Sequence, residues 1–160
     1  MGFYLLPLFV ATFFWGMFAL QANFNSSILP SVREQRVGIS GQIFLQYRDD
    51  LARYQKANPT FLGVVPSSSL ANQYPAAFLA IAGNEITASS SGSGRVITAY
   101  AQLERSAIVQ ALAITQNDAS LGFAAGGTWR SAANGVNQID VPLATGVPDG
   151  NAVSVVQIGV

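Results

Sequence analysis

The first 32 residues of this 160-residue chain contain no Asp, Glu, Lys or Arg. Within this stretch the segment Phe3 to Leu20, FYLLPLFVATFFWGMFAL, is almost entirely apolar and aromatic. A helix of that length rises about 27 Å, close to the ~30 Å hydrocarbon core of a bilayer. We therefore predict a transmembrane helix at residues 3–20. Pro7 lies near its beginning, where a missing amide costs least, and Trp15 lies toward the far interface.

Two other interpretations of the apolar segment stay open. In a cleaved secretory signal Ala22 could mark the cut, although only the α-amino group supplies the positive charge that precedes the apolar run in such signals. The other alternative is a helix buried in a protein core. The predicted organisation is a transmembrane anchor with a short linker at residues 1–29, followed by one α+β domain at residues 30–160.

The charges that flank the predicted span leave its orientation open. Arg33 and Arg36 follow the span and no basic residue precedes it, so the positive-inside rule favours a cytoplasmic C-terminal domain. Two charges govern the translocation of a long polar domain only weakly. The remainder of the chain is poor in lysine and rich in Ser, Thr, Asn and Gln, which is typical of exported proteins.

Composition excludes several classes of function. The eight basic and eight acidic residues cancel, which removes any bulk electrostatic case for nucleic-acid binding. Histidine and cysteine are absent. The chain therefore has no Ser-His or Cys-His pair, no imidazole or thiolate metal site and no disulfide. We predict no cofactor, no metal, no nucleic acid and no small-molecule substrate.

A long amphipathic helix is predicted after the apolar segment. Ser31 is a possible N-cap, and Glu34 three residues later completes a capping-box pattern. The apolar face recurs at spacings of four, four and three residues: Ile43, Tyr47, Leu51 and Tyr54. Gly38 and Gly41 each disfavour a helix by about 1 kcal/mol relative to Ala, so the helix is either bent there or begins near Gly41.

Short elements are predicted beyond Asn58-Pro59, which ends the helix because the residue before proline leaves the helical region. A short helix is predicted from residue 66 to 74, where Pro75 ends it, followed by a strand or loop at 76–82 and a flexible turn at 89–94. A strand is also predicted at 95–103, and a helix at 106–115 with Ile108, Leu112 and Ala113 on one face. Strands are predicted at 121–125, 128–131, 136–141 and 153–158, separated by turns at Gly126-Gly127, Asn134-Gly135 and Asp149-Gly150. The predicted fold is α+β, with the long helix packed on a small antiparallel sheet with a second helix, a pilin-like plan.

Few residues suggest chemistry. Asp49 and Asp50 are neighbours that point about 100° apart on a helix, so we interpret them as a solvated face rather than an acid–base pair. Lys56 is the only lysine and would be needed for a Ser/Lys dyad, but its place on the polar side of a helix predicts a solvated side chain. The glycine-rich turn at 92–94 lacks the Lys and Thr of a phosphate-binding loop. We nominate no catalytic, cofactor-binding or metal-binding residue.

The stretch YRDDLARYQKANPTFLGVVP, residues 47–66, carries a pattern of spaced residues that resembles a known family. The pattern comprises Tyr47, Arg48, Tyr54, Ala57, Asn58, Pro59, Gly63, Val65 and Pro66, then Leu70 and a further proline. It continues in Leu121-Gly122, the strand around Trp129, Val141-Pro142-Leu143 and Val147-Pro148-Asp149-Gly150. Together with the N-terminal apolar helix, these residues resemble the small PilM-type inner-membrane proteins of plasmid-encoded type IVb thin pili. The actin-like cytoplasmic proteins of the same name differ, since this chain lacks their length and nucleotide motifs.

The resemblance implies a non-enzymatic component for building the pilus used in conjugative transfer. It implies a single-pass inner-membrane protein whose domain at 30–160 lies in the periplasm. The implied partners are other proteins of the pilus machine, together with membrane lipid around residues 3–20. The resemblance carries no catalytic residues.

Two alternatives from other functional classes remain. A pilin or minor pilin has the same plan, and Gly2-Phe3 resembles a prepilin cleavage junction. However, Pro7 would then occupy the position where pilins usually place a glutamate, and no basic residue precedes the glycine. A membrane-tethered hydrolase is the third hypothesis.

Overall fold

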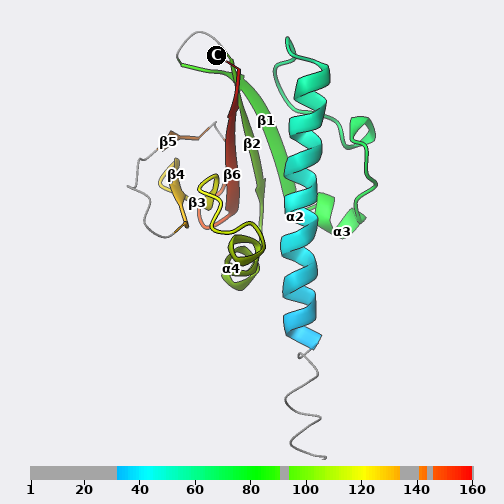
Figure 1. Cartoon of the computed structure of the whole chain (residues 1–160), viewed down its shortest axis with the longest axis vertical. Helices are drawn as coiled ribbons and strands as arrows, with labels where there is room; N and C mark the ends of the chain where they lie inside the picture. Colours follow the sequence, from blue (N-terminus) through cyan, green and yellow to red (C-terminus); the bar gives the residue numbers. More distant parts are fainter. Residues whose placement is uncertain (1–31, 91–93, 134–140, 144–145, 160) are drawn as a thin grey trace, which may run out of the picture. The chain divides into compact units, whose positions relative to one another are not determined.

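A computed structural model describes residues 32–90, 94–133, 141–143 and 146–159. The elements in chain order are α2 (Val32–Ala57), the 3-10 helix η1 (Ser67–Ser69), α3 (Ala76–Leu79), β1 (Ala82–Ala88), β2 (Arg95–Ala101), α4 (Arg105–Ile114), β3 (Leu121–Ala125), β4 (Thr128–Ser131), β5 (Val141–Pro142) and β6 (Ala152–Ile158) (Figure 1). The α+β prediction is confirmed.

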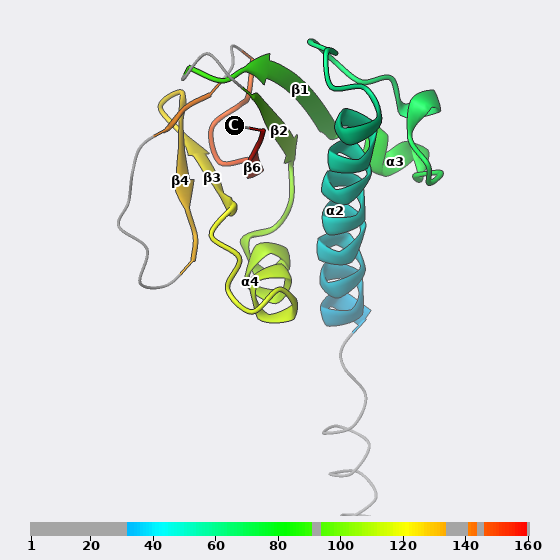
Figure 2. The ribbon, with the colours of Figure 1, turned by 45° about the horizontal axis from the view of Figure 1, so that its top comes forward.

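The strands form a six-stranded sheet in the order β1-β2-β6-β3-β4-β5, and each neighbouring pair is antiparallel. The last strand, β6, lies between β2 and β3, where Val156 is opposite Ile97 and Ser154 is opposite Leu121. The sheet is strongly curled, so that the β3–β4 hairpin turns toward the side on which α4 lies (Figure 2). The central position of β6 means that the sheet is completed only when the end of the described chain is in place.

The β3–β4 hairpin turns at Gly126-Gly127, as the sequence predicts. The two glycines have φ angles of +58° and +73°, which suit the primed turns that match strand twist and which other residues adopt at a cost. The carboxylate of Asp149 accepts a 2.9 Å hydrogen bond from the backbone N–H of Gly126. The turn is therefore tied to the segment that leads into β6.

The core lies between α2 and the sheet. Phe44 and Leu51 on α2 are completely buried, and they belong to one apolar cluster with Ile86 of β1 and Ile97 of β2. Burying a large aliphatic or aromatic side chain stabilises a fold by about 1.5–3 kcal/mol. This cluster therefore accounts for the position of α2 beside β1 and β2 (Figures 1 and 2).

Helices α2 and α4 approach each other closely at Gly41. A Cβ atom placed on Gly41 would lie 2.7 Å from the carbonyl oxygen of Ala107, a distance that real Cβ atoms do not reach. Helix α2 begins at Val32 and continues through this position. Gly41 is therefore neither the start of the helix nor a break in it; it allows the two backbones to pack.

The buried face of α2 differs from the predicted one. Tyr47 and Leu51 are buried as predicted, but Ile43 and Tyr54 are only half-buried, and Phe44 and Gln55 are buried instead. The predicted spacing of four, four and three residues assumes that the helix buries a single apolar stripe. Here the helix contacts α4 and the sheet on one side and the segment after it on another, so the buried face is wider and shifted.

Three short elements were predicted incorrectly. Of the helix predicted at 66–74 only η1 forms, and α3 lies at 76–79, where a strand or loop was expected. Pro75 precedes α3 as its N-cap residue and begins a helix instead of ending one, because proline leaves the first helical turns undisturbed. Strand β1 was missed because Asn84 and Glu85 interrupt its apolar pattern.

The remaining predicted elements agree with the structure where it describes them. Strands β2, β3, β4 and β6 and helix α4 occupy the predicted stretches to within a few residues. Of the strand predicted at 136–141, only residue 141 lies within the described part of the chain, in β5. The predicted anchor at 1–29 lies outside the described residues. In the part that is described, no helix combines the length and apolar character needed to cross a bilayer.

Candidate interaction groove

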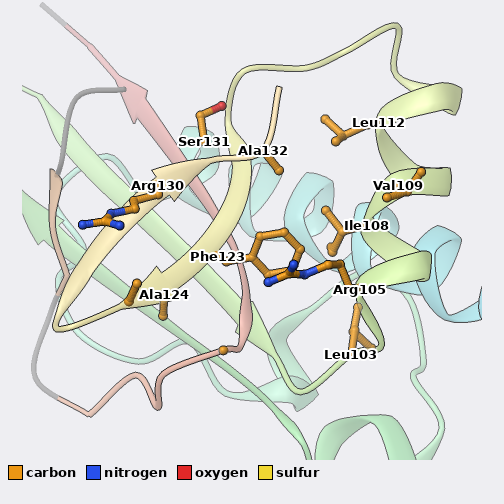
Figure 3. A pocket seen from close by; sticks show the side chains of 12 residues that line it. Leu103, Arg105, Ile108, Val109, Leu112, Phe123, Ala124, Arg130, Ser131 and Ala132 are labelled. Carbon is orange, nitrogen blue, oxygen red and sulfur yellow. The ribbon is translucent and has the colours of Figure 1, made fainter. Parts of the chain in front are cut away.

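A groove of about 480 Å³ lies between α4 and the β3–β4 hairpin (Figure 3). Helix α4 contributes Ile108, Val109 and Leu112, which recur at helical spacing, and the hairpin side contributes Phe123 and Ala132. Sheet curl and the antiparallel pairing of β3 with β4 hold Phe123 opposite the helix. The groove is therefore a mainly apolar surface between a helix and a twisted hairpin.

The guanidinium of Arg105 lies over the ring of Phe123, with 5.3 Å between its central carbon and the ring centroid. A cation over an aromatic face stabilises such a pair by about 0.5–1 kcal/mol at an exposed site. Figure 3 shows both side chains in the groove, whereas Arg130 points away from α4. Arg105 thus places positive charge directly beside an apolar surface.

Val109 is the most exposed large apolar residue of the groove, at 60%. Its neighbour Ile108 is completely buried, as expected for positions about 100° apart on a helix. A second hollow of about 550 Å³ shares Val109, Leu112 and Ala132 with the groove and continues toward the end of α4. The two hollows form one continuous surface along the outer side of α4.

The end of α4 has an unusual backbone. Gln116 and Asn117 have φ angles of +54° and +70°, and the N–H of Asn117 donates a 2.8 Å hydrogen bond to the carbonyl of Leu112. Asn adopts this left-handed region more readily than most residues, whereas Gln is strained by about 1–3 kcal/mol. Both residues line the second hollow, so the strained turn shapes the end of the groove surface.

Three polar clusters join α2 to other parts of the domain. In the first, the carboxylate of Asp50 is 2% exposed and accepts hydrogen bonds from the backbone N–H of Asn72 at 3.0 Å and from the hydroxyl of Tyr74 at 2.7 Å. Arg53 forms an ion pair with the same carboxylate. A buried charge is tolerated when it is paired and hydrogen-bonded in this way. This Asp50 cluster fastens the segment after α2 back onto the helix.

The second cluster centres on Asn84 of β1. Its Oδ1 accepts a 2.7 Å hydrogen bond from the N–H of Val65, and its Nδ2 donates to the carbonyl of Val65 at 3.1 Å. The same Nδ2 donates to the hydroxyl of Tyr47 at 2.7 Å. Burial raises the pKa of Tyr47 above its usual value, which keeps the hydroxyl protonated. Asn84 therefore joins α2, β1 and the segment between them.

The third cluster joins α2 to the turn after α4. A guanidinium nitrogen of Arg48 donates a 2.6 Å hydrogen bond to Asp118, and the backbone N–H of Ser120 donates to the other carboxylate oxygen at 2.9 Å. Burial alone would raise the pKa of Asp118, but the hydrogen bonds from Ser120 and Arg48 outweigh it and lower that pKa. The cluster fixes α4 and β3, which form the two walls of the groove.

The residues that the sequence singled out are not brought together. Asp49 is exposed and pairs with Arg48, whereas Asp50 is buried, so the interpretation of both as a solvated face is wrong for Asp50. Lys56 is exposed, as predicted. Gly94, the one described residue of the turn at 92–94, leads into β2 with φ at +97°. Among the described residues, no three His, Cys, Asp or Glu side chains form a group that could hold a metal.

Sequence reasoning missed the groove and the three clusters. The apolar face of α4 was predicted from Ile108, Leu112 and Ala113, but Ala113 is exposed and the buried residues are Ala107, Ile108 and Ala111. The available signal was the number of apolar residues in α4, which is larger than one buried face can hold. Val109 and Ile114 fall outside that face and are exposed. Their exposure became evident only once the partners of the helix were known.

The model of the PilM family matches residues 13–155. The chain belongs to the PilM family. The predicted resemblance to PilM-type proteins of plasmid-encoded pili, as opposed to the actin-like proteins of that name, is thereby confirmed. The PilM assignment supports involvement in a pilus-related function.

One solved structure, described as a protein PilM from Escherichia coli B7A, has a similar fold. The match covers 81% of this chain and 98% of that chain, with a TM-score of 0.58 and 14% sequence identity. At this identity the likeness concerns the PilM fold alone. No curated protein matches the chain.

Proposed function

We propose that this chain is a membrane-anchored, non-enzymatic assembly component of a type IVb thin-pilus machine that supports conjugative transfer. In this proposal residues 1–29 form the anchor and short linker, and the domain at residues 30–160 lies in the periplasm. Its partners are other proteins of the machine. The observation that carries the proposal is the PilM family match, which extends from residue 13 in the apolar segment to residue 155 in the domain.

The groove supports a role in protein binding. Interface energy concentrates in a few apolar or aromatic anchors, and the groove offers a partly exposed apolar surface between two well-fastened walls. Its charged lining residues, Arg105 and Arg130, are both basic, and among its described lining residues there is no carboxylate. We therefore assign to it a partner segment that presents a bulky apolar side chain next to an acidic one.

A complementation experiment tests the assembly role. A host that carries the pilus plasmid without this gene should lack pili and transfer DNA poorly, and the full-length chain should restore both. A form without Phe3 to Leu20 should restore neither, because the domain is released from the membrane. Normal piliation without the gene would contradict the proposal.

Fractionation and N-terminal sequencing separate this proposal from a pilin. An assembly component stays in the inner-membrane fraction and keeps Met1-Gly2, whereas a pilin is found in sheared pili and begins at Phe3. A periplasm-dependent reporter fused after Val160 tests the orientation. An active cytoplasmic reporter at the same position would overturn the proposed localisation.

A further inference from the structure

A second, smaller pocket of about 370 Å³ lies where the end of α2 meets the start of β2 and the end of β6. It shares no described lining residue with the groove on α4. Gln55, Lys56 and Pro59 line it from α2 and the turn that follows, and Arg95 and Ile158 line it from the paired ends of β2 and β6. Its volume lies at the small end of the range for ligand sites.

Gln55, which lines this pocket, carries a buried side-chain acceptor without a hydrogen-bond partner. The residue is 2% exposed, and its Nε2 donates a 3.1 Å hydrogen bond to the carbonyl of Pro59. That bond fixes the orientation of the amide, because the reverse orientation would set two oxygens against each other. Its Oε1 is buried and has no hydrogen-bond partner. A buried acceptor without a partner destabilises a fold, so the orphan oxygen requires an explanation.

Arg95, which lines the same pocket, carries a buried side-chain donor without a hydrogen-bond partner. Its Nη1 donates a 2.9 Å hydrogen bond to the carbonyl of Gly94, which holds the guanidinium in place. Its Nε is buried and has no hydrogen-bond partner. Two residues that line the pocket thus carry one orphan acceptor and one orphan donor, on side chains that other bonds already orient.

The charge of the pocket specifies the ligand further. Lys56 and Arg95 are its charged lining residues, and both are positive. A matching ligand must accept hydrogen bonds, carry negative charge and also donate one hydrogen bond to Gln55. The last residue of a polypeptide has this combination, because its carboxylate and its backbone N–H are attached to the same carbon atom.

We propose that this pocket binds the C-terminal carboxylate end of a polypeptide. The N–H of the last peptide bond donates to Oε1 of Gln55, and the terminal carboxylate accepts from Nε of Arg95 and pairs with Lys56. Capture of a terminal carboxylate is an established mode of peptide recognition. An internal Asp or Glu carries its carboxylate on a longer, freely rotating side chain, so it matches the two oriented groups less well.

The test uses the full-length, ¹⁵N-labelled chain in detergent micelles. The probe is N-acetyl-Gly-Val with a free carboxylate, titrated while the side-chain N–H signals of Gln55 and Arg95 are followed by NMR. We expect saturable shifts of both signals. N-acetyl-Gly-Val amide, which keeps the N–H groups and loses the charge, should bind at least about tenfold more weakly. Equal binding of the acid and the amide would overturn the proposal, as would shifts caused by inorganic phosphate and not by the peptide.

Two variants and one control extend the test. Arg95→Lys keeps the positive charge and loses the Nε donor, and Gln55→Met loses the acceptor at similar volume; each should weaken binding at least about tenfold. Arg36→Lys makes the same chemical change near the other end of α2, about 28 Å away along the helix, and should bind the probe normally. Because the acid and amide probes are compared on the unaltered chain, the proposal stays testable even if a variant fails to fold.

A last arm asks whether the chain's own end occupies the pocket. The titration is repeated on a chain lengthened after Val160 by a neutral Gly-Ser linker. Similar affinity for the probe in both chains supports capture of a foreign terminus. Binding to the lengthened chain alone would make the chain's own carboxylate the occupant and would overturn the proposal. None of these outcomes depends on the pilus role, so the two proposals fail separately.

Discussion

The hydroxyl of Tyr74 donates a 2.7 Å hydrogen bond to the buried carboxylate of Asp50, 24 residues earlier in the chain. Asn72 donates to the same carboxylate, so two residues of the segment after α2 form hydrogen bonds with one charged side chain of the helix. Burial and the neighbouring carboxylate raise the pKa of Tyr74 above its usual value of about 10. The Asp50 cluster therefore closes the segment between α2 and β1 onto the helix.

Tyr74→Phe removes this hydrogen bond and keeps the ring. Hydrogen bonds to charged groups stabilise proteins by about 1.5–3 kcal/mol, so we expect the free energy of unfolding to fall by that amount. Urea denaturation measures it. Tyr54→Phe is the control, because the ring of Tyr54 keeps its edge contact with Phe61, 5.3 Å away, and should change stability by less than about 0.5 kcal/mol. Equal losses in the two variants would contradict the importance of the bond to Asp50.

The same bond predicts how stability depends on pH. The folded state holds the Tyr74 proton more tightly than the unfolded state, so its contribution is complete below about pH 10 and is lost as the pH rises toward the raised pKa. Thermal melts from pH 8 upward should therefore show a loss of stability above pH 10. Tyr74→Phe should lose less over that interval, because phenylalanine does not titrate. A steeper loss in the variant would contradict the direction assigned to this pKa.

Gly41 and Gly38 provide a matched pair on α2. Replacing a helical glycine with alanine favours the helix by about 1 kcal/mol, and Gly38→Ala should show part of this gain, since its new Cβ meets only the movable end of Gln110 at 2.9 Å. At Gly41 the Cβ would meet the backbone of Ala107, so Gly41→Ala should destabilise the domain by about 1–3 kcal/mol. Denaturant melts of both variants check the opposite signs. Destabilisation of the same size at both positions would mean that α2 and α4 do not meet at Gly41.

The sequence predicted the elements whose signals are local. The alternation from Val96 to Ala101 and the paired glycines at 126–127 determine strand and turn almost independently of their surroundings. Non-local effects produced the errors. The local pattern predicts that Pro75 ends a helix, whereas Pro75 precedes α3. Nothing close in sequence to Asp50 indicates that Asn72 and Tyr74 bury it.

The groove could not be predicted for the same reason. Its walls come from α4 and from a hairpin whose position depends on β6. That strand pairs with β2, which lies 51 to 63 positions earlier, from Ala152 opposite Ala101 to Ile158 opposite Arg95. Helical spacing places Val109 and Leu112 on neighbouring faces of α4, but it does not show which face the sheet leaves open. The curl of the sheet determines which face of α4 is left open.

Tyr47 and Tyr54 share a face in the sequence pattern, and the structure separates them. Tyr47 is 3% exposed, packs edge-on against Tyr74 at 5.3 Å and accepts a hydrogen bond from Asn84, whereas Tyr54 is half-buried. Tyr47→Ala should therefore reduce the free energy of unfolding by about 3–5 kcal/mol, and Tyr54→Ala by clearly less. Lys56→Ala, an exposed change on the same helix, should alter it by less than about 0.5 kcal/mol. Equal losses of stability for the two variants in urea melts would support the sequence prediction that both tyrosines lie on one buried face of the helix.

Val109 and Ile114 test the groove itself, because both are exposed apolar residues of α4, at 60% and 54%, and only Val109 lines the groove. Val109→Glu places a carboxylate in the apolar surface, four residues from Arg105, where it competes for the guanidinium that the partner's acidic group would bind. If the groove is a docking site, loss of an interface anchor of about 2 kcal/mol weakens the partner about thirtyfold, so pilus yield and conjugation frequency should fall. Ile114→Glu makes the same change outside the groove and should leave both near normal.

The comparison is valid only for folded protein, so both variants are first checked for membrane level and melting behaviour. Exposed substitutions of this kind alter stability by less than about 0.5 kcal/mol, and neither side chain contributes to the buried core. Normal piliation with Val109→Glu would exclude the groove as a docking site while leaving the family assignment untouched. Equal loss with Ile114→Glu would show that the whole exposed side of α4, and not the space beside Phe123, is the surface that matters.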